Sequence, residues 1–400
     1  MRNPQFSAGH LGKLLTRRDF ALNPTLHSTD QRHELLSRVE TRLLDLIDAP
    51  LRVLSSEGEK PFFYLPDIED NLAARACAKS LNRSLKITYP SRNKCVSELK
   101  SFVMEQGPFT ILKIDLKSFF ETIDIENAMA TIEPHLDIQT TRSCMAILNS
   151  HRNNGGIGLP RGIPISNPIS EKYMNDFDRI ISSERGILFY CRYVDDIIIL
   201  DGEMRDKNDL VNIIRSSLPK GLSINHRKIE HKKSSPDTEG KFSIDYLGYN
   251  FEVSSTKEGK KSIKDLIVKM SDKKVKRFMD KIVRSSIRYR KDGDFDLFLD
   301  RILFLSSNRK IKSSSRDSSS LSGIYYDNSQ ITSIDDLEKL DKFLIGTVVN
   351  QYKKPISIKS ILSKTQRNLL LSCSFKNGFE KRKFKEFSHR RLGMIAKAWK

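Results

Sequence analysis

The chain has 400 residues, of which 30% are charged and 38% are apolar, and it carries a net charge of +19. A chain of this length can bury a substantial core, and no apolar run approaches the roughly 18 residues that a membrane span requires. The start of the sequence also lacks the apolar stretch of a secretory signal. These features argue against a membrane or exported protein and predict a cytoplasmic protein that binds a polyanion. A basic protein without a specific partner and a membrane-surface protein are the alternatives.

The cysteines and histidines are scattered along the chain. The five cysteines form no Cys-x-x-Cys pair and no cluster with histidine; they are Cys77, Cys95, Cys144, Cys191 and Cys373. Such spacing predicts thiols, mostly buried, in a reducing compartment, and it gives no support to a zinc site. Nucleophilic chemistry of the Cys/His or Ser/His type is likewise not indicated.

The N-terminal region is expected to be mostly helical up to about residue 75. Apolar residues between Leu35 and Ile47 recur at helical spacing, after capping residues that begin at Ser28. Between residues 75 and 105, basic residues alternate with short apolar runs. We predict a strand at residues 85–89 there, followed by a turn at residues 90–94.

Two adjacent carboxylates, Asp195 and Asp196, lie between two apolar runs within residues 189–200. The runs are rich in β-branched and aromatic residues, which predicts two buried strands joined by a tight hairpin turn. Neighbouring acids in apolar surroundings repel each other and lose solvation, so we expect them to share a divalent cation such as Mg²⁺. A solvated turn is the alternative for the dipeptide taken alone.

A third carboxylate, Asp115, follows the apolar run at residues 111–114 and is expected to end another buried strand. Asp124 then predicts the N-cap of a helix from Ile125 to Ile132. Three such carboxylates predict a two-metal site, in which one ion activates a 3′-hydroxyl and the other neutralises the leaving pyrophosphate. Taken alone, Asp115 also fits an ordinary strand-end or capping acid.

Five ordered motifs resemble those of reverse transcriptases. Residues 193–196 (YVDD) are similar to the YxDD signature of that family, and residues 114–120 (IDLKSFF) to its first catalytic motif. The other three are residues 158–166 (GLPRGIPIS), 222–230 (LSINHRKIE) and 246–249 (YLGY), which resemble the LPxG, LxLNxxKTE and FLGY motifs. The resemblance implies an α+β fold of the right-hand polymerase type. Its parts are fingers, a palm whose antiparallel sheet carries the catalytic acids, and a helical thumb.

The resemblance also implies roles for individual residues. The catalytic acids Asp115, Asp195 and Asp196, together with Leu116, would form the site of two Mg²⁺ ions, or of Mn²⁺. Phe120 would lie beside the sugar of the incoming nucleotide and exclude a 2′-hydroxyl. The residues implied in substrate binding are Arg83, Arg92, Lys94, Arg161, Gly162 and Lys228, and those implied in holding primer or nucleic acid are Tyr193, Tyr246, Leu247, Gly248, Lys274 and Arg277. Many family members have Gln where this chain has Arg161, and for each basic residue a solvated surface position is the alternative.

From about residue 254 onward, apolar residues recur at helical spacing beside a basic flank. This pattern predicts a helical thumb lying along a nucleic-acid duplex, with a solvated charged face as the alternative. Residues 310–322 are rich in Ser, Lys and Arg and predict a loop. Residues 376–400 mix basic and aromatic side chains, which is typical of proteins that bind structured RNA, although helix packing also explains the aromatic residues.

We therefore divide the chain into an N-terminal helical segment (residues 1–75), a fingers and palm core (76–255) and a basic helical thumb and C-terminal region (256–400). The predicted function is that of an RNA-directed DNA polymerase that makes cDNA from dNTPs. The compact chain most resembles bacterial defence-associated reverse transcriptases, in particular the first subunit of antiphage systems with two such enzymes. That resemblance implies a non-coding RNA and a second reverse transcriptase subunit, or a homo-oligomer, as partners. Template-independent or protein-primed DNA synthesis, a group II intron maturase and a catalytically silent RNA-binding scaffold are the alternatives.

Overall fold

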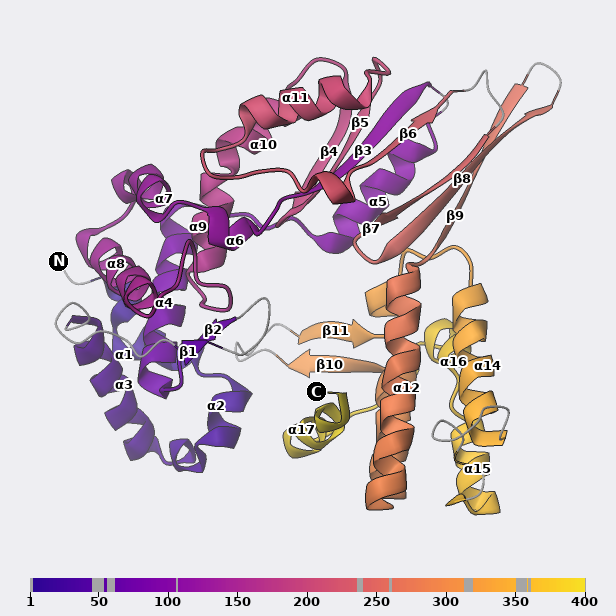
Figure 1. Ribbon diagram of the computed structural model, residues 1–400. Coiled ribbons are helices and arrows are strands. Elements are labelled where there is room, and N and C mark those ends of the chain that lie inside the picture. Colours follow the sequence, from indigo (N-terminus) through magenta and orange to yellow (C-terminus); the bar gives the residue numbers. More distant parts are fainter. Residues whose placement is uncertain are drawn as a thin grey trace. The chain divides into compact units, whose positions relative to one another are not determined.

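The computed structural model describes residues 3–44, 54–55, 62–105, 107–235, 240–258, 261–312, 319–349, 358 and 361–399 (Figure 1). Helices and antiparallel strands both occur, so the predicted α+β class is confirmed. The chain forms two compact units, Met1–Ser91 with Gly107–Ser235 and Arg92–Gln106 with Pro236–Lys400. The division at residues 75 and 255 stays a prediction. Among the described helices, none combines the length and the apolar character needed to cross a membrane.

The first unit contains a four-stranded antiparallel sheet in the order β4-β5-β3-β6. Its strands are β3 (Phe109–Asp115), β4 (Ile187–Tyr193), β5 (Asp196–Asp201) and β6 (Glu230–Ser234). Ile197 to Leu200 are all buried, because β5 is a central strand and protein covers both of its faces. Unbroken apolar runs are typical of such strands. The predicted strands on either side of Asp195 and Asp196 are therefore confirmed.

The first unit also contains helices on both sides of the sheet strands in the sequence. They are α1 (Ala8–Leu11), α2 (Arg17–Leu22), α3 (Thr29–Leu44), α4 (Ile68–Ser84), α6 (Phe119–Thr122), α7 (Ile125–Ile132), α8 (Ile138–Asn153), α9 (Ser166–Tyr173), α10 (Asn175–Ser182) and α11 (Lys207–Ser217). Ile197 and Ile199 of β5 share one core with Leu210 and Ile214 of α11. The predicted N-cap of α7 is confirmed, since the Asp124 carboxylate accepts the backbone N–H of Asn127 at 2.8 Å.

The start of the first unit is helical, as the sequence predicts, over the described residues 3–44. A short 3-10 helix at Pro4–Phe6 precedes α1, and two others, at Gly12–Leu14 and Pro24–His27, connect α1, α2 and α3. Two-residue strands, β1 (Leu54–Ser55) and β2 (Phe63–Tyr64), form a small antiparallel pair before α4.

The predicted strand at residues 85–89 is wrong. Helix α4 runs to Ser84, and Leu85 caps its C-terminus by donating its N–H to the carbonyl of Leu81. Lys86 then takes a left-handed conformation with φ of 50°, which no β-strand accommodates. The predicted turn at residues 90–94 is also wrong in part, because helix α5 (Arg92–Val103) begins within it.

The second unit contains an antiparallel sheet of three strands, β7 (Gly240–Tyr246), β8 (Tyr249–Glu258) and β9 (Lys261–Met270). The expected helical pattern from residue 254 is wrong up to Met270, where β8 and β9 instead form a long hairpin. Beyond it the helical prediction is confirmed. The helices are α12 (Asp272–Asp292), α13 (Phe295–Ser306), α14 (Asp335–Val349), α15 (Lys364–Leu371), α16 (Phe375–Glu380) and α17 (His389–Ala396).

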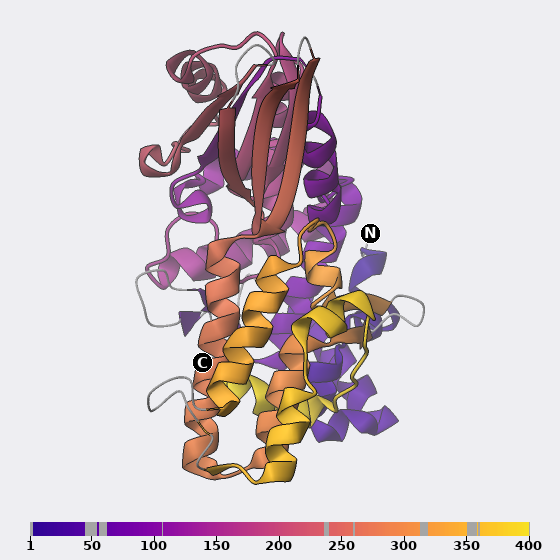
Figure 2. The ribbon, with the colours of Figure 1, turned by 90° about the vertical axis from the view of Figure 1, so that its right-hand side faces the viewer.

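Helices α12 and α14 run side by side in the second unit, as Figure 2 shows. Their buried residues, such as Val275, Ile282 and Leu340, share one core with Phe298 of α13. The loop predicted at residues 310–322 is wrong at both ends, because β10 (Asn308–Lys312) pairs with β11 (Ser319–Gly323). Residues 313–318 lie outside the described part of the chain. All five cysteines are buried thiols, which confirms that prediction.

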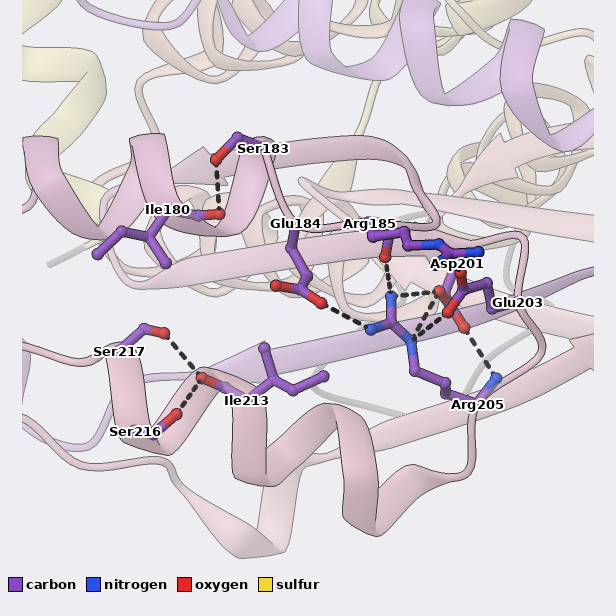
Figure 3. A network of polar contacts seen from close by, with 10 residues as sticks. All are labelled: Ile180, Ser183, Glu184, Arg185, Asp201, Glu203, Arg205, Ile213, Ser216 and Ser217. Carbon is purple, nitrogen blue, oxygen red and sulfur yellow. Dashed lines mark hydrogen bonds and ion pairs between the residues drawn. The ribbon is translucent and has the colours of Figure 1, made fainter.

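A buried ion pair fixes the end of the β4–β5 hairpin that lies away from Asp195 (Figure 3). The Asp201 carboxylate is fully buried and accepts the backbone N–H of Arg205 at 2.8 Å and its guanidinium at 2.7 Å. The same guanidinium pairs with Glu184 at 3.0 Å. These hydrogen bonds raise the pKa of Arg205. The buried carboxylate of Asp201, paired with Arg205, thus anchors this end of the hairpin.

Arg205→Ala is expected to lower the free energy of unfolding by about 3 kcal/mol, because it leaves the buried Asp201 carboxylate without its cation. Urea unfolding measures this change. The matched control is Arg185→Ala, which removes an exposed pair with Glu203 and should cost less than about 1 kcal/mol. Equal losses in the two variants would contradict the role given to Asp201.

Candidate active site

The three predicted catalytic acids lie at one end of the four-stranded sheet. In the antiparallel pairing of β3 with β5, Asp115 stands directly opposite Asp196. Asp195 lies in the turn between β4 and β5, and its carbonyl accepts the N–H of Leu116 at 3.0 Å. Side chains that face each other across such a pair have their Cβ atoms about 5 Å apart. The register therefore brings acids from distant parts of the chain together.

The electrostatics of this end are dominated by the carboxylates. Burial raises the pKa of Asp195, and the charge of Asp115 raises it further. Burial and the charge of Asp195 raise the pKa of Asp196 in the same way. Lys228 opposes them, since its ammonium bonds to Asp115 at 2.8 Å and its own pKa is raised by that hydrogen bond. Arg161 opposes the rise at Asp195 and Lys113 opposes it at Asp196, but the pKa values of both acids remain raised, so burial and mutual repulsion outweigh these cations.

The donors fit a hard divalent cation, because carboxylate oxygens are its preferred ligands and the repulsion between them would be relieved by its charge. Within the described residues, however, no group of three His, Cys, Asp or Glu side chains is arranged to hold a metal ion. Asp115 is directed toward Lys228 and also accepts the amide of Asn225 at 3.2 Å. Leu116 is buried and pairs with Ile224.

The predicted sugar gate lies in the short helix α6. Phe119 is buried in the core, and its neighbour Phe120 is only partly buried. The Arg161 guanidinium lies 6.0 Å from the Phe120 ring and pairs with Glu121 at 2.9 Å. The charge of Arg161 partly opposes the rise in the pKa of Asp195, so the guanidinium influences the catalytic end of the sheet. Glu121 was not predicted, because only its contact with Arg161 reveals it.

Gly162, which follows Arg161, permits a close approach of two backbones. Its φ is +100°, and a Cβ there would lie 2.5 Å from the carbonyl oxygen of Phe63. A larger residue would push β2 away from this loop, where the N–H of Phe63 bonds to the carbonyl of Arg161 at 2.6 Å. The substrate contact expected of Gly162 stays a prediction.

The basic residues expected at the triphosphate are spread over both units. Arg83 is exposed in the last turn of α4 in the first unit. Arg92 and Lys94 belong to α5 in the second unit, where Lys94 lies 3.6 Å from Glu98. Their contact with a nucleotide stays a prediction, and the hydrogen bonds of Arg92 give it a second, structural role.

A buried arginine supports the turn that carries Asp195. Val194 has a φ of 61°, a conformation that β-branched residues rarely adopt. The Arg192 guanidinium, 3% exposed, donates to the Val194 carbonyl at 3.1 Å. The same group bonds to Asp178 at 2.7 Å and to Glu171 at 2.8 Å. Burial alone would lower the pKa of Arg192, but these two carboxylates outweigh it and raise that pKa.

A second turn, in the second unit, is supported in the same way. Tyr246 and Tyr249 pair across it, with Leu247 at φ 46° and Gly248 at φ 77° between them. The Arg92 guanidinium donates to the Leu247 carbonyl at 2.9 and 2.5 Å. In each turn, an arginine therefore binds the carbonyl of the left-handed residue that is not glycine.

Two cations lie against one aromatic ring beside this second turn. Arg92 is 5.0 Å and Lys274 is 5.2 Å from the centre of the Tyr249 ring. Burial and the charge of Arg92 lower the pKa of Lys274 to about 7. Arg277 is exposed one turn further along α12. Arg92, Lys274 and Arg277 are three of the residues expected to hold nucleic acid or substrate, and their binding roles stay predictions.

The α+β fold, with strand-borne acids gathered at one end of an antiparallel sheet, is that of a right-hand polymerase. Residues 66–251 match the family model described as reverse transcriptase (RNA-dependent DNA polymerase). This part of the chain is similar to reverse transcriptase domains, and the match indicates the enzyme class RNA-directed DNA polymerase, a nucleotidyltransferase. Enzymes of this family generally use divalent metals.

Two solved telomerase structures are similar to the chain. The telomerase of Candida albicans, in complex with a fragment of telomeric RNA, gives a TM-score of 0.37 at 13% identity, over 81% of this chain and 53% of that one. The apo telomerase of Candida tropicalis gives 0.29 at 15% identity, over 58% and 47%. The chain thus spans about half the length of each. No curated protein matches its sequence.

Proposed function

We propose that the protein synthesises cDNA on an RNA template by nucleotidyl transfer from dNTPs. The observation that carries this proposal is the strand register that sets Asp115 opposite Asp196, with Asp195 in the adjoining turn, inside the part of the chain that is similar to reverse transcriptase domains. These acids, with Leu116, would hold the two Mg²⁺ ions, which when bound supply charge for the attacking and leaving oxygens.

The chain's own residues complete the proposed site. Lys228, kept protonated by Asp115, provides a positive charge for the negative charge that develops on the leaving pyrophosphate. Arg161 supplies a second fixed cation, which Glu121 orients. Phe120 would occupy the space that a 2′-hydroxyl needs, and the turn of Leu247 and Gly248 would hold the primer end.

We further propose that the protein is bacterial and cytoplasmic and acts in antiphage defence, with a non-coding RNA and a second reverse transcriptase subunit. This part of the proposal is supported by the sequence motifs alone. The large positive charge of the chain is consistent with an RNA partner.

The first test is incorporation of labelled dNTPs by the purified protein with its co-purifying RNA. Incorporation that requires RNA, and a product whose sequence is complementary to that RNA, would support the proposal. Incorporation that survives ribonuclease, with a product unrelated to any RNA, would instead favour untemplated or protein-primed synthesis. RNA binding without incorporation under any dNTP mixture would point to a scaffold.

Phe120→Ala is expected to raise the relative use of ribonucleotides about tenfold or more, because it opens space for the 2′-hydroxyl. The ratio of kcat/KM for rGTP and dGTP on one primed RNA template measures this preference. Phe119→Leu serves as the control, since that neighbouring ring lies in the core. An unchanged ratio in Phe120→Ala would remove the sugar gate from the proposal.

A further inference from the structure

An exposed basic segment runs along one edge of the second unit. Residues 381–385 (Lys-Arg-Lys-Phe-Lys) follow α16 and are all exposed. Their backbone lies beside β10, where the N–H of Asn308 donates to the carbonyl of Lys383 at 2.7 Å and the N–H of Lys385 to the carbonyl of Asn308 at 2.8 Å. We refer to residues 381–385 as the basic edge segment.

Hydrogen bonds from Asn308 hold the backbone of the basic edge segment in place. The buried Asn308 amide donates to the carbonyls of Gly378 and Lys383 at 3.0 and 3.1 Å, and it accepts the N–H of Tyr325 at 2.9 Å. A Cβ on Gly378 would overlap the carbonyl of Ser306, so this approach requires glycine. The segment is therefore ordered before any partner binds, which reduces the entropy lost on binding.

One aromatic ring in this segment is open to a partner. Phe384 is 46% exposed, and its ring packs on Tyr326 at a centroid distance of 5.9 Å. Tyr326 in turn meets Tyr325 edge-on at 5.1 Å. The Arg382 guanidinium lies 4.2 Å over the Tyr325 ring and donates to its hydroxyl at 2.8 Å. The Phe384 ring is thus supported by the packed rings of Tyr326 and Tyr325.

Arg382 holds this position in a left-handed conformation, with a φ of 46°. Such a conformation is unfavourable for arginine and persists only where the surroundings enforce it. Here the enforcing contacts are the Tyr325 ring and hydroxyl, together with the bond from the Arg382 N–H to the carbonyl of Phe379 at 3.2 Å. The strain maintains the direction in which the neighbouring side chains of the segment project.

The positive charge of the basic edge segment is not neutralised locally. Some other surface bases of this unit have acidic partners, such as Lys269 with Glu252, Arg288 with Asp292, Lys376 with Glu338 and Arg391 with Asp300. Within the part of the chain that the structure describes, no ion pair joins the four bases of the segment to a carboxylate. Phosphate groups complement such a surface.

We propose that the basic edge segment and Phe384 form a binding site for single-stranded RNA, distinct from the catalytic acids of the first unit. An exposed ring between lysines suits an unpaired base, which stacks on the ring while its phosphates meet the cations. Bases inside a duplex are already stacked, so they are not available to Phe384. The choice of RNA over DNA rests on the proposed function, whereas the stacking site itself does not.

The test is the affinity of the full-length protein for a labelled single-stranded RNA of mixed sequence, measured by fluorescence anisotropy without dNTPs. Phe384→Ala is expected to weaken binding about tenfold, and Phe384→Tyr to preserve it. Ile361→Ala is the matched control, because it removes another exposed apolar side chain of the same unit.

The lysines are tested through salt dependence. The triple variant Lys381→Gln/Lys383→Gln/Lys385→Gln should reduce the slope of log K against log salt by up to about 2, since each lost phosphate contact removes roughly 0.7. Lys376→Gln, whose ammonium is paired with Glu338 at 2.8 Å, should leave the slope nearly unchanged.

Three results would overturn the proposal. These are an unchanged affinity in Phe384→Ala, tighter binding of single-stranded DNA than of RNA, and displacement of the RNA by polyglutamate at equal charge concentration. The same variants are assayed for dNTP incorporation on a short primed template. If the wild type binds RNA through Phe384 but incorporates nothing, the polymerase function fails and the binding site stands.

Discussion

Replacing Asp195 and Asp196 together by asparagine is expected to reduce dNTP incorporation by at least about a thousandfold. Asp196 stands opposite Asp115 in the strand register and Asp195 lies in the adjoining turn, and asparagine keeps the shape of both side chains while removing their charge. The fold should be retained, because the repulsion among three partly buried acids disappears with the substitution. Single-turnover incorporation on a primed RNA template measures the loss, and thermal unfolding measures the fold.

The control for this prediction is Asp176→Asn in α10, which removes an exposed acid of the same unit that pairs with Arg179. It should leave incorporation within about twofold of the wild type, since exposed pairs contribute little. Mg²⁺ adds a second measurement. Mg²⁺ should raise the melting temperature of the wild type and of Asp176→Asn, but not that of the double variant Asp195→Asn/Asp196→Asn. Full activity in the double variant would show that neither Asp195 nor Asp196 is a catalytic residue.

Strands β3, β4 and β5 of the central sheet could be predicted because their sequence signal is local, whereas the polar strand β6 was not predicted. β5 is an unbroken apolar run, and the acids that interrupt such runs must lie at strand ends. β9 was missed for an equally physical reason. Its buried face includes Lys264 and its exposed face includes Ile263 and Ile267, so hydrophobicity does not alternate along the strand. The β10–β11 hairpin was missed because polar residues, chiefly Ser and Lys, form most of it.

The arginines that support the two turns could not be identified from the sequence, because their hydrogen-bond partners are distant in the chain. Arg92 binds a carbonyl 155 residues away, and only the folded second unit reveals that contact. Arg192 is near Val194 in sequence, but its carboxylate partners come from α9 and α10. The sequence identified the turn at Val194 and not the one at Leu247, since the pattern of residues 246–249 predicts a strand, and in neither case did it identify the arginine that supports the left-handed residue.

Arg192→Met is expected to lower the free energy of unfolding by about 3 kcal/mol and incorporation by about tenfold or more. The stability falls because Glu171 and Asp178 lose their cation in a poorly solvated place. Incorporation falls because the Val194 carbonyl loses its donor, so that Asp195 is no longer held in one position. Arg179→Met, which breaks an exposed pair in the same helix as Asp178, should change stability by less than about 1 kcal/mol.

A triple variant separates the two effects of Arg192. In Arg192→Met/Glu171→Gln/Asp178→Asn no buried charge is left unpaired, so most of the lost stability should return. The bond to the Val194 carbonyl is still absent, so incorporation should remain about tenfold below the wild type, with the loss in kcat and not in KM for the dNTP. Recovery of incorporation together with stability would mean that Arg192 only balances charge. Persistent loss in a stable protein would mean that it positions the catalytic turn.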